Sequence, residues 1–173
     1  ILKDSLANLQ RKLLLDGLSY DAHAPYIMNR LLAFYELDSF RIMADRLEEL
    51  CPNWAIALGD IGYGYYLRGE VSSCIEYYKK SIAVDSTILP TYFWMGVSFA
   101  TLGDHQQARK WWSLHVQKSH EKKALMQSGT YLRESFDLGN SLLNLQRYEE
   151  AEHEFEAFLK LDSLDVQGWY GLG

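Results

Sequence analysis

A glycine-rich segment, GDIGYGYYLRGE, spans residues 59–70 and raises the question of a nucleotide site. Glycine-rich turns bind phosphate when they join a strand to a helix and present free backbone N–H groups at the start of that helix. No strand pattern precedes Gly59, and the spacing GxxGxG differs from the dinucleotide-binding motif. Asp60 and Glu70 would also repel a phosphate group. The segment therefore predicts helix, and no cofactor is expected.

The histidines and cysteines form no pattern typical of a metal site or a catalytic centre. His115 and His120 are five residues apart, whereas two metal ligands on one helix face are usually four apart. Cys51 and Cys74 form neither a CxxC pair nor a disulfide framework, which favours a cytoplasmic location. Cys74 is expected to be buried and inert. We therefore predict no metal, no catalytic residue and no enzymatic activity in this chain.

The composition indicates a globular helical protein. Of the 173 residues, 48% are hydrophobic and 23% charged, and only 3 are proline, which favours helices. The net charge of −6 argues against nucleic-acid binding, and the basic segment 108–123 is interpreted as a solvated helix face. No apolar run is long enough to span a membrane. Since the chain begins with Ile1 and ends within a predicted helix, we expect it to be a fragment of a longer protein.

Three segments of the chain are similar to one another. IGYGYYLRGEVSSCIEYYKKS, from Ile61, and MGVSFATLGDHQQARKWWSLH, from Met95, match at an offset of 34 residues. LGNSLLNLQRYEEAEHEFEAF, from Leu138, follows at an offset of 43, so nine residues are inserted before it. The matching positions are Gly62, Gly96 and Gly139; Gly69 and Gly103; Cys74, Ala108 and Ala151; and Tyr78, Trp112 and Phe155.

This pattern resembles the tetratricopeptide repeat, in which 34 residues form two antiparallel helices. The third copy departs from it, with Leu142 at an aromatic position and Gln146 in place of the turn glycine. The resemblance covers residues 55–173 and implies an all-α fold, an α-solenoid of antiparallel helix hairpins with about nine helices in the whole chain. It divides that region into repeats 55–88, 89–122 and 132–165 and a partial repeat 166–173.

The remaining segments are expected to be helical as well. Residues 1–54 are predicted to hold N-terminal helices, including one at 2–18 and a degenerate repeat at 21–54. In that repeat, a helix beginning at Asp38 or Ser39 would present Phe40 and Leu47 on one face. The inserted segment between the second and third copies either extends the neighbouring helices or forms a functional loop.

Capping signals mark the predicted second helices. Gly69 and Gly103 suit a helix end that requires a positive φ. Ser72 and Asp104 are good N-cap residues, and Asp104 with Gln107 forms a capping-box pattern. The first helices of the first two copies are therefore predicted to end in a glycine turn that leads directly into the second helix.

The glycines of the opening segment are predicted to have different roles. Gly62 occupies the repeat position where a small residue lets two helices approach closely. Gly64 has no counterpart in the other copies and is expected only to weaken its helix. Gly59 is four residues before Tyr63, where the absence of a side chain would leave room for a partner.

The resemblance also implies a binding surface, because the first helices of such repeats line a concave channel. Asn140 and Asn144 lie one turn apart and would each hydrogen-bond a peptide backbone. Only Arg133 is basic, which disfavours the acidic chaperone tails that one co-chaperone subfamily binds. Partners with apolar or aromatic anchors fit better. Alternatively, these aromatic residues pack against one another or against a helix outside this sequence. The predicted site residues are Gly59, Tyr63, Tyr66, Phe93, Val97, Arg133, Phe136, Asn140, Asn144 and Tyr170.

The leading functional hypothesis is non-enzymatic protein–protein binding, with a peptide or helix of a partner protein in this channel. No nucleic acid or membrane is expected as a partner. A second hypothesis is a substrate-docking or regulatory region of a larger enzyme, such as a glycosyltransferase, whose catalytic part lies elsewhere. A third is an architectural spacer that self-associates through its open C-terminal end.

Overall fold

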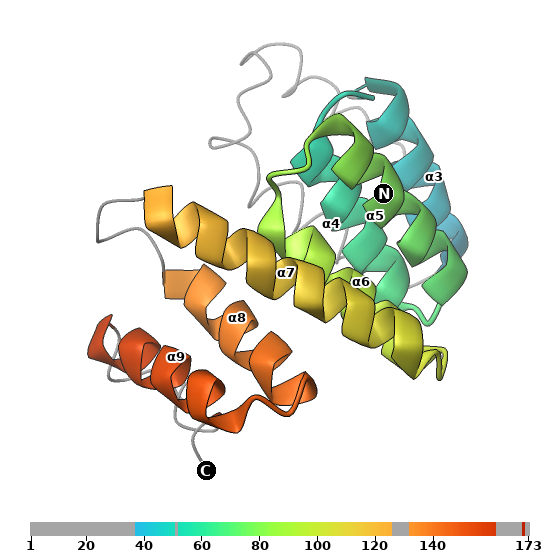
Figure 1. Cartoon of the computed structure of the whole chain (residues 1–173). Coiled ribbons are helices and arrows are strands. Elements are labelled where there is room, and N and C mark those ends of the chain that lie inside the picture. The colour runs from blue at the N-terminus through green and yellow to red at the C-terminus, as the bar shows by residue number, and fades with distance from the viewer. Residues whose placement is uncertain (1–36, 51, 126–131, 162–170, 172–173) are drawn as a thin grey trace. The chain divides into compact units, whose positions relative to one another are not determined.

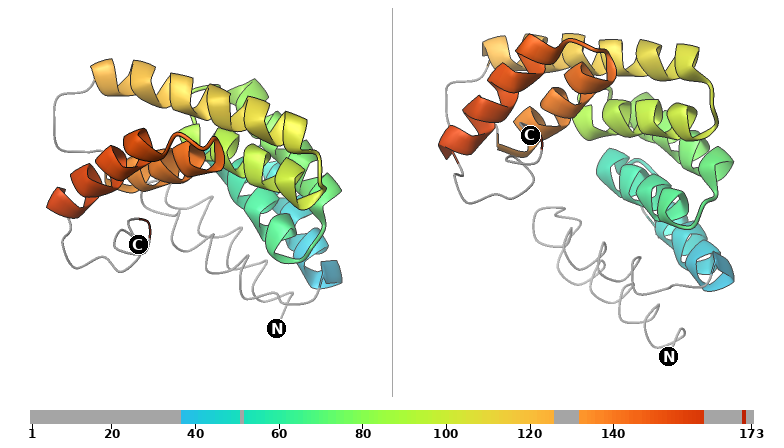
Figure 2. Two further views of the ribbon diagram at one scale, coloured as in Figure 1. Left: turned by 60° about the horizontal axis from the view of Figure 1, so that its bottom comes forward. Right: turned by 90° about the horizontal axis from the view of Figure 1, so that it is seen from below.

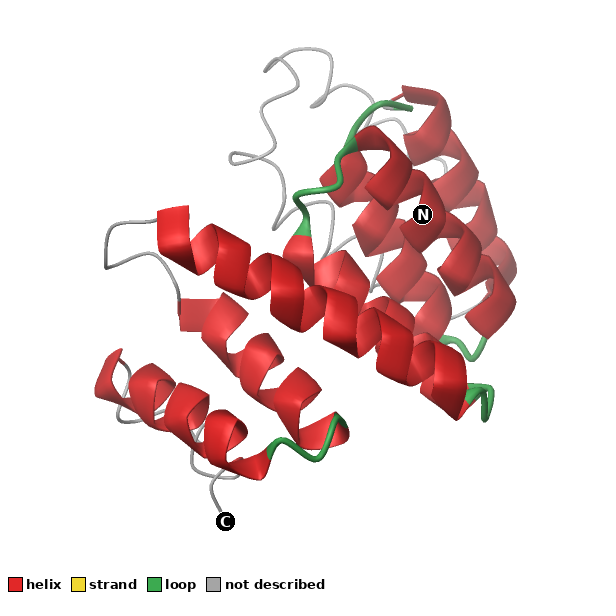
Figure 3. Ribbon diagram, viewed as in Figure 1, coloured by secondary structure: helices red, strands yellow, loops and turns green. Residues whose placement is uncertain are grey.

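The computed structural model describes residues 37–50, 52–125, 132–161 and 171. Within these ranges the chain is all-α, with no strand, as Figure 3 shows. The helices are α3 (Leu37–Leu50), α4 (Ala55–Leu67), α5 (Val71–Val84), α6 (Leu89–Thr101), α7 (His105–Leu125), α8 (Leu132–Asn144) and α9 (Tyr148–Leu161). The predicted all-α fold is confirmed. The predicted helix at 2–18 and most of the partial fourth repeat lie outside the described residues.

The chain divides into two compact units, Ile1–Ser86 and Thr87–Gly173, and each is considered by itself. In the first unit α4 packs against α5, and α3 packs against α4. In the second unit α6 pairs with α7 and α8 pairs with α9, while α8 also contacts both α6 and α7. Figures 1 and 2 show the helices of each pair lying side by side. The first unit therefore contains one described helical hairpin, α4–α5, and the second contains two, α6–α7 and α8–α9.

One contact recurs in each of the three hairpins. A glycine of the first helix faces an aromatic ring of the second so closely that a Cβ atom on the glycine would lie under 3.0 Å from that ring. The pairs are Gly62 with Tyr78, Gly96 with Trp112, and Gly139 with Phe155. Any larger residue would push the helices apart, so the predicted role of these glycines in close packing is confirmed.

The turns within the hairpins also share one geometry. Gly69 and Gly103 both have φ of 77°, and Gln146 takes φ of 62° at the equivalent position. In the first turn, the backbone N–H of Gly69 donates to Tyr66 and that of Glu70 donates to Tyr65, which is a Schellman motif. The same pair of bonds closes the other two turns. The third hairpin therefore keeps the left-handed turn without the glycine.

The N-caps of the second helices follow the prediction in one case only. The backbone N–H of Gln107 donates to Asp104 Oδ1 over 3.0 Å, which confirms Asp104 as a cap. The prediction for Ser72 is wrong, because α5 begins at Val71 and Glu70 occupies the N-cap position. The Schellman turn places the N-cap two residues earlier than the side-chain signal indicated, so Ser72 falls inside the helix.

The prediction for Gly64 is wrong too. A Cβ atom at this position would lie 2.4 Å from the Phe40 ring, so the glycine lets α3 approach α4. The Phe40 ring also meets Tyr65 edge-on, with 4.8 Å between ring centroids, and the Arg68 guanidinium lies 4.0 Å above its centre. Comparison among the repeat copies could not reveal this role, because Phe40 lies in a helix that precedes them. As expected, Phe40 and Leu47 are buried on α3.

Helix α7 absorbs most of the inserted segment. It has 21 residues, whereas α5 and α9 have 14 each. Helix extension was one of the two interpretations of the insertion, and it holds as far as Leu125. Residues 126–131 are outside the described ranges. The added turns of α7 carry Ser119 and Lys123, both of which make contacts described below.

Candidate functional site

The predicted binding residues come from the first helix of each hairpin, α4, α6 and α8. Helix α4 belongs to the first unit, and α6 and α8 belong to the second. Within the second unit α6 and α8 contact each other directly. The residues on α6 and α8 can therefore be considered together, and those on α4 separately.

In the first unit, Tyr63 and Tyr66 are partly buried and their rings are stacked. The ring centroids are 6.5 Å apart and the planes differ by 16°. Gly59 is partly buried as well, one turn before Tyr63. The only charged residue in α4 is Asp60. The structure thus places a pair of aromatic side chains, both with exposed area, on a nearly uncharged helix.

In α6, Phe93 is more deeply buried than a binding residue is expected to be. Its side chain is 9% exposed and belongs to a core cluster with Ala108 and Trp112. The ring also lies 6.0 Å from the imidazole of His115, measured between centroids. Val97 is partly buried against the same cluster and keeps some exposed surface. Phe93 therefore contributes to the core of the second unit, and its contact with a partner stays a prediction.

In α8, the asparagines bond to their own helix. Asn140 Nδ2 donates to the backbone oxygen of Phe136 over 2.9 Å, and Asn144 Nδ2 donates to that of Asn140 over 2.8 Å. These bonds orient both amides and leave Oδ1 of each as the atom that can accept a bond from a peptide N–H. Phe136 is partly buried, with its ring 5.9 Å from Phe155 and 5.8 Å from Phe158. Asn144 is exposed.

Two predicted residues cannot be placed in the same detail. Arg133 lies in the first turn of α8, but its side chain is outside the described part of the structure. Tyr170 lies outside the described residues altogether. Their roles in binding remain predictions.

A buried polar group between α7 and α8 was not predicted as a feature of the site. His115 is fully buried, and its Nδ1 lies 2.8 Å from Ser141 Oγ, while Nε2 lies 3.4 Å from Ser119 Oγ. Burial lowers the pKa of His115 to about 4, so the ring is neutral near pH 7. The sequence held a signal, because Ser81 occupies the same repeat position and is also buried, donating to the Ala55 carbonyl. This position is structural in both hairpins.

An ion pair ties the extension of α7 to α9. Lys123 Nζ lies 2.8 Å and 3.0 Å from the two carboxylate oxygens of Glu154. The Glu154 side chain is only 8% exposed, so its charge depends on this partner. The pair joins residues 31 positions apart, and no local sequence pattern could have indicated it.

The described ranges were also searched for metal sites and for helices that could span a membrane. They contain no group of three or more histidine, cysteine, aspartate or glutamate side chains placed to hold a metal ion. Among these same residues, no helix is both long and apolar enough to cross a membrane. Cys74 is buried, as expected.

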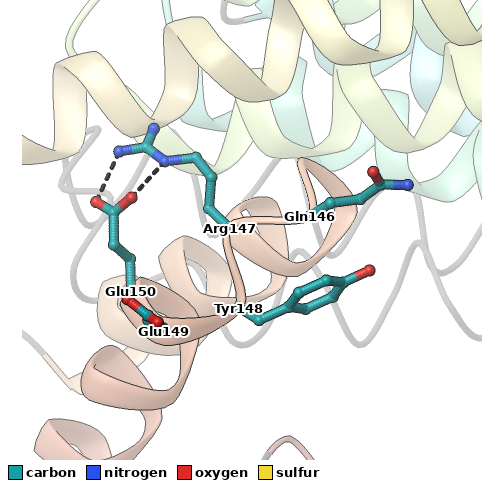
Figure 4. A pocket seen from close by; sticks show the side chains of 5 residues that line it. All are labelled: Gln146, Arg147, Tyr148, Glu149 and Glu150. Atoms are coloured by element: carbon teal, nitrogen blue, oxygen red, sulfur yellow. Dashed lines mark hydrogen bonds and ion pairs between the residues drawn. The ribbon is translucent and has the colours of Figure 1, made fainter.

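An open pocket lies at the α8–α9 turn, which follows Asn144, and is lined by residues 146–150 (Figure 4). On one side, the Arg147 guanidinium makes two bonds of 2.7 Å to the Glu150 carboxylate. On the other, the Tyr148 side chain is 63% exposed. With its guanidinium and carboxylate bonded to each other, the pocket offers no evident nucleophile and base.

Comparison with known proteins identifies the repeat. The family model of the tetratricopeptide repeat matches residues 135–163, which cover most of α8 and α9. The α8–α9 hairpin is therefore identified as a tetratricopeptide repeat. This agrees with the three glycine–aromatic contacts and the three matching turns. No curated protein gives a significant match to the chain.

Several solved structures share the fold of this repeat protein. The first tetratricopeptide domain of Spaghetti (RPAP3), bound to the HSP90 peptide SRMEEVD, is 20% identical, with a TM-score of 0.51 over 68% of this chain and 89% of that one. The protein MamA MSR-1 C2 is 18% identical, with a TM-score of 0.54 over 87% and 80%. The assembly chaperone of RpL4 (Acl4, residues 1–338) is 15% identical, with a TM-score of 0.57 over 100% and 56%. Such identities establish the α-solenoid fold alone.

Proposed function

We propose that this chain is a non-enzymatic protein-interaction module that binds a peptide or helix of a partner protein along its first helices. The observation that carries the proposal is the arrangement on α8, where Asn140 and Asn144 lie one turn apart with both amides oriented by their own backbone. Two acceptors at this spacing suit the N–H groups of an extended segment. Because the amides are already held in place, little side-chain entropy is lost on binding.

Apolar side chains beside the asparagines would supply most of the binding energy. We call the side chains of α6 and α8 at the predicted binding positions the inner face of the second unit. Of the described ones, Val97, Phe136, Asn140 and Asn144 are not fully buried, and the neighbouring Ala100, Thr101 and Leu143 keep exposed area as well. Burying partly exposed apolar area contributes about 25 cal/mol for each Å² removed from water.

The stacked tyrosines of α4 offer a comparable surface in the first unit. Tyr63 and Tyr66 combine a broad apolar ring with a hydroxyl group, and such residues often dominate the energy of protein interfaces. The domain of Spaghetti (RPAP3) supports the general proposal, because that domain has the same fold and its structure contains a bound short peptide. It does not identify the partner of the present chain.

Selection from random twelve-residue peptides displayed on phage would test the proposal without a known partner. We expect enriched peptides to bind the purified protein, and the double substitution Asn140→Ala and Asn144→Ala to weaken that binding about tenfold, equivalent to roughly 1.4 kcal/mol. Fluorescence anisotropy would measure the affinity and circular dichroism the helical content.

Ser113→Ala, on the exposed surface of α7, is the matched control and should leave the affinity unchanged. Tyr63→Ala tests the first unit in the same way. Failure to enrich any peptide, or equal binding by the asparagine variant, would contradict the proposal.

A further inference from the structure

Each unit contains a polar connection between two helices whose backbones do not pack together. In the first unit, Glu48 of α3 accepts a hydrogen bond of 2.7 Å from the Tyr77 hydroxyl and one of 2.8 Å from Lys80 Nζ, both on α5. In the second unit, Lys123 of α7 meets Glu154 of α9. Among the described residues, the backbone of α3 makes no contact with that of α5, nor does α7 with α9. Side chains alone therefore make these connections.

The two connections differ in how deeply the carboxylate is buried. The side chains of Glu48 and Lys80 are 31% and 36% exposed, so water solvates both charges. The Glu154 side chain is 8% exposed, whereas that of Lys123 is 45% exposed and bonds to both carboxylate oxygens. A carboxylate at this depth has lost most of its hydration and is costly without a cation beside it. In the second unit, a lysine that water can reach thus compensates a buried charge.

The length of α7 makes this connection possible. A helix of 14 residues, the length of α9, would end at Lys118 if it began where α7 begins, and Lys123 lies beyond that point. His120 lies in the same added turns. The bond from Arg147 is the main reason that the pKa of the Glu150 carboxyl lies below its usual value, and the positive charge of protonated His120 adds to this effect. The added turns therefore approach α9 at two of its acidic side chains.

Glu154 lies beside the aromatic residues of α9 that pack against α8. It directly precedes Phe155 and is one turn before Phe158. The rings of these two residues lie 5.9 Å and 5.8 Å from the Phe136 ring, measured between centroids. Phe136 belongs to the inner face of the second unit and is only partly buried. Movement of α9 would therefore change the packing that orients a side chain of the inner face.

The second unit has two core clusters, which allow one part of it to open without the other. Phe93, Ala108 and Trp112 form the cluster between α6 and α7, and this cluster contains no residue of α9. Ala151 and Phe155 of α9 belong to the other cluster. Folded proteins open locally in cooperative groups of residues of this kind. Loss of a contact that supports α9 can therefore leave the α6–α7 cluster intact.

We infer that the added turns of α7 act as a strap, in which Lys123 holds α9 in place through the charge of Glu154 and thereby fixes the Phe136 ring. When this pair is broken, α9 opens while α6 and α7 stay folded. Lys123 does not belong to the inner face, so the strap lets a charge outside that face control one of its side chains. The strap is a property of the folded chain and does not depend on peptide binding.

Hydrogen exchange of the 173-residue chain, followed by NMR at individual amides, would test the strap. In Lys123→Met the Glu154 carboxylate loses its cation. We expect the amides of α9 to exchange at least about tenfold faster than in the wild type, and those of α6 to change by less than about twofold. The amide chemical shift of Phe136 should move in the same variant.

Two single substitutions serve as controls. Lys123→Arg keeps the positive charge and should retain the exchange rates of the wild type. Lys110→Met removes one positive charge from an exposed position of α7 and should leave the exchange of α9 unchanged. A double substitution provides the rescue. Lys123→Met combined with Glu154→Met leaves no uncompensated charge, so α9 should exchange within about threefold of the wild-type rate.

Three outcomes would overturn the strap. Unchanged exchange of α9 in Lys123→Met would mean that the pair does not hold this helix. Equal acceleration in α6 and α9, or complete unfolding, would mean that the pair supports the whole unit. Continued fast exchange in the double variant would mean that Lys123 acts through a contact other than Glu154. None of these results bears on peptide binding, which the phage selection tests separately.

Discussion

In the α6–α7 hairpin the packing glycine, Gly96, meets the indole of Trp112, whereas in the α8–α9 hairpin Gly139 meets the ring of Phe155. The turns differ as well, with Gly103 in one and Gln146 in the other. Their second helices have 21 and 14 residues. Both hairpins nevertheless close with the same glycine–aromatic contact and the same turn hydrogen bonds. This contact and this backbone geometry define the hairpin, and the residues around them are free to vary.

The two aromatic rings, Trp112 and Phe155, differ in how much they stabilise the folded state. Trp112 Nε1 is buried, and none of the residues that the structure describes provides a hydrogen-bond partner for it. Leaving such a donor unsatisfied costs about 1–3 kcal/mol. Phe155 fills the equivalent place with no polar atom and is fully buried. The α8–α9 hairpin therefore has the more favourable form of the shared contact.

The largest expected effect is the loss of that ring. Phe155→Ala should lower the free energy of unfolding by about 3–5 kcal/mol, because it leaves a cavity between Gly139 and Phe136. Trp112→Phe should cost much less, since removing the unsatisfied N–H offsets the lost contacts. Urea denaturation followed by circular dichroism would measure both. Equal costs would show that the rings are equivalent and that the orphan donor carries no penalty.

The next effect concerns the junction between the hairpins, where His115 of α7 meets Ser141 of α8. Burial lowers the pKa of His115 from 6.5 in the unfolded chain to about 4 in the folded one. The unfolded chain binds the proton more readily than the folded one. The contribution of neutral His115 to the free energy of unfolding is therefore fully present above pH 6.5 and is lost as the pH falls toward 4. The loss amounts to roughly 3 kcal/mol, at about 1.4 kcal/mol for each pH unit.

Denaturation at several pH values would measure this slope. The His115→Gln variant should be less stable at pH 7 but should lack that part of the slope. If both proteins showed the same slope between pH 6.5 and 4, the histidine would not be responsible for it.

Overpacking should affect both hairpins to a moderate degree. Ala108 and Ala151 occupy the same repeat position in α7 and α9, and both are fully buried. Substituting either with leucine should cost about 1–3 kcal/mol, since the added atoms have no space between the helices. Thermal melts of Ala108→Leu and Ala151→Leu would test this. Wild-type stability in either variant would mean that the hairpin tolerates wider helix spacing than the contact implies.

The smallest effect should come from the turns. Gln146→Gly is expected to raise the free energy of unfolding by about 0.5–1 kcal/mol, because a side chain is unfavourable at a φ of 62°. The reverse change, Gly103→Gln, should lower it by about 1 kcal/mol. A Cβ atom on Gly103 would have nothing within 4 Å, so backbone strain is the only expected cost there. No change in either variant would indicate that the turn is not strained.

Much of the fold was predictable from the spacing of residues, because residues that recur at the same position of each repeat have the same structural role. The offset of 34 residues aligned Gly62 with Gly96, and the structure gives both the same contact. The residues whose roles were predicted wrongly are determined by contacts and turns that a comparison of the repeat copies does not reveal. Gly64 leaves room for Phe40 of the preceding helix, and Ser72 lies inside α5 because the turn places the N-cap two residues earlier.

Less of the candidate site was predictable. Helical spacing indicated which face of α8 holds Asn140 and Asn144, but not that their Nδ2 atoms bond to the backbone. The spacing also placed Phe93 at a binding position. It could not indicate that the Phe93 side chain is buried, because this burial results from contacts with Ala108 and Trp112 across the hairpin. The pair of Lys123 and Glu154 also required the fold, because these residues are far apart in sequence.

The uncharged composition of α6 also has a consequence for synthesis on the ribosome. Its 13 residues leave the exit tunnel before α7 and α8, the helices that contact them. Until those helices follow, the nascent chain exposes an apolar segment with no charged residue to oppose aggregation. We expect a chain that stops at Asp104 to collect in the insoluble fraction, whereas the 173-residue chain stays in the supernatant. Helix α6, which we propose contacts a partner, is thus also a helix that needs protection from aggregation while the protein is being made.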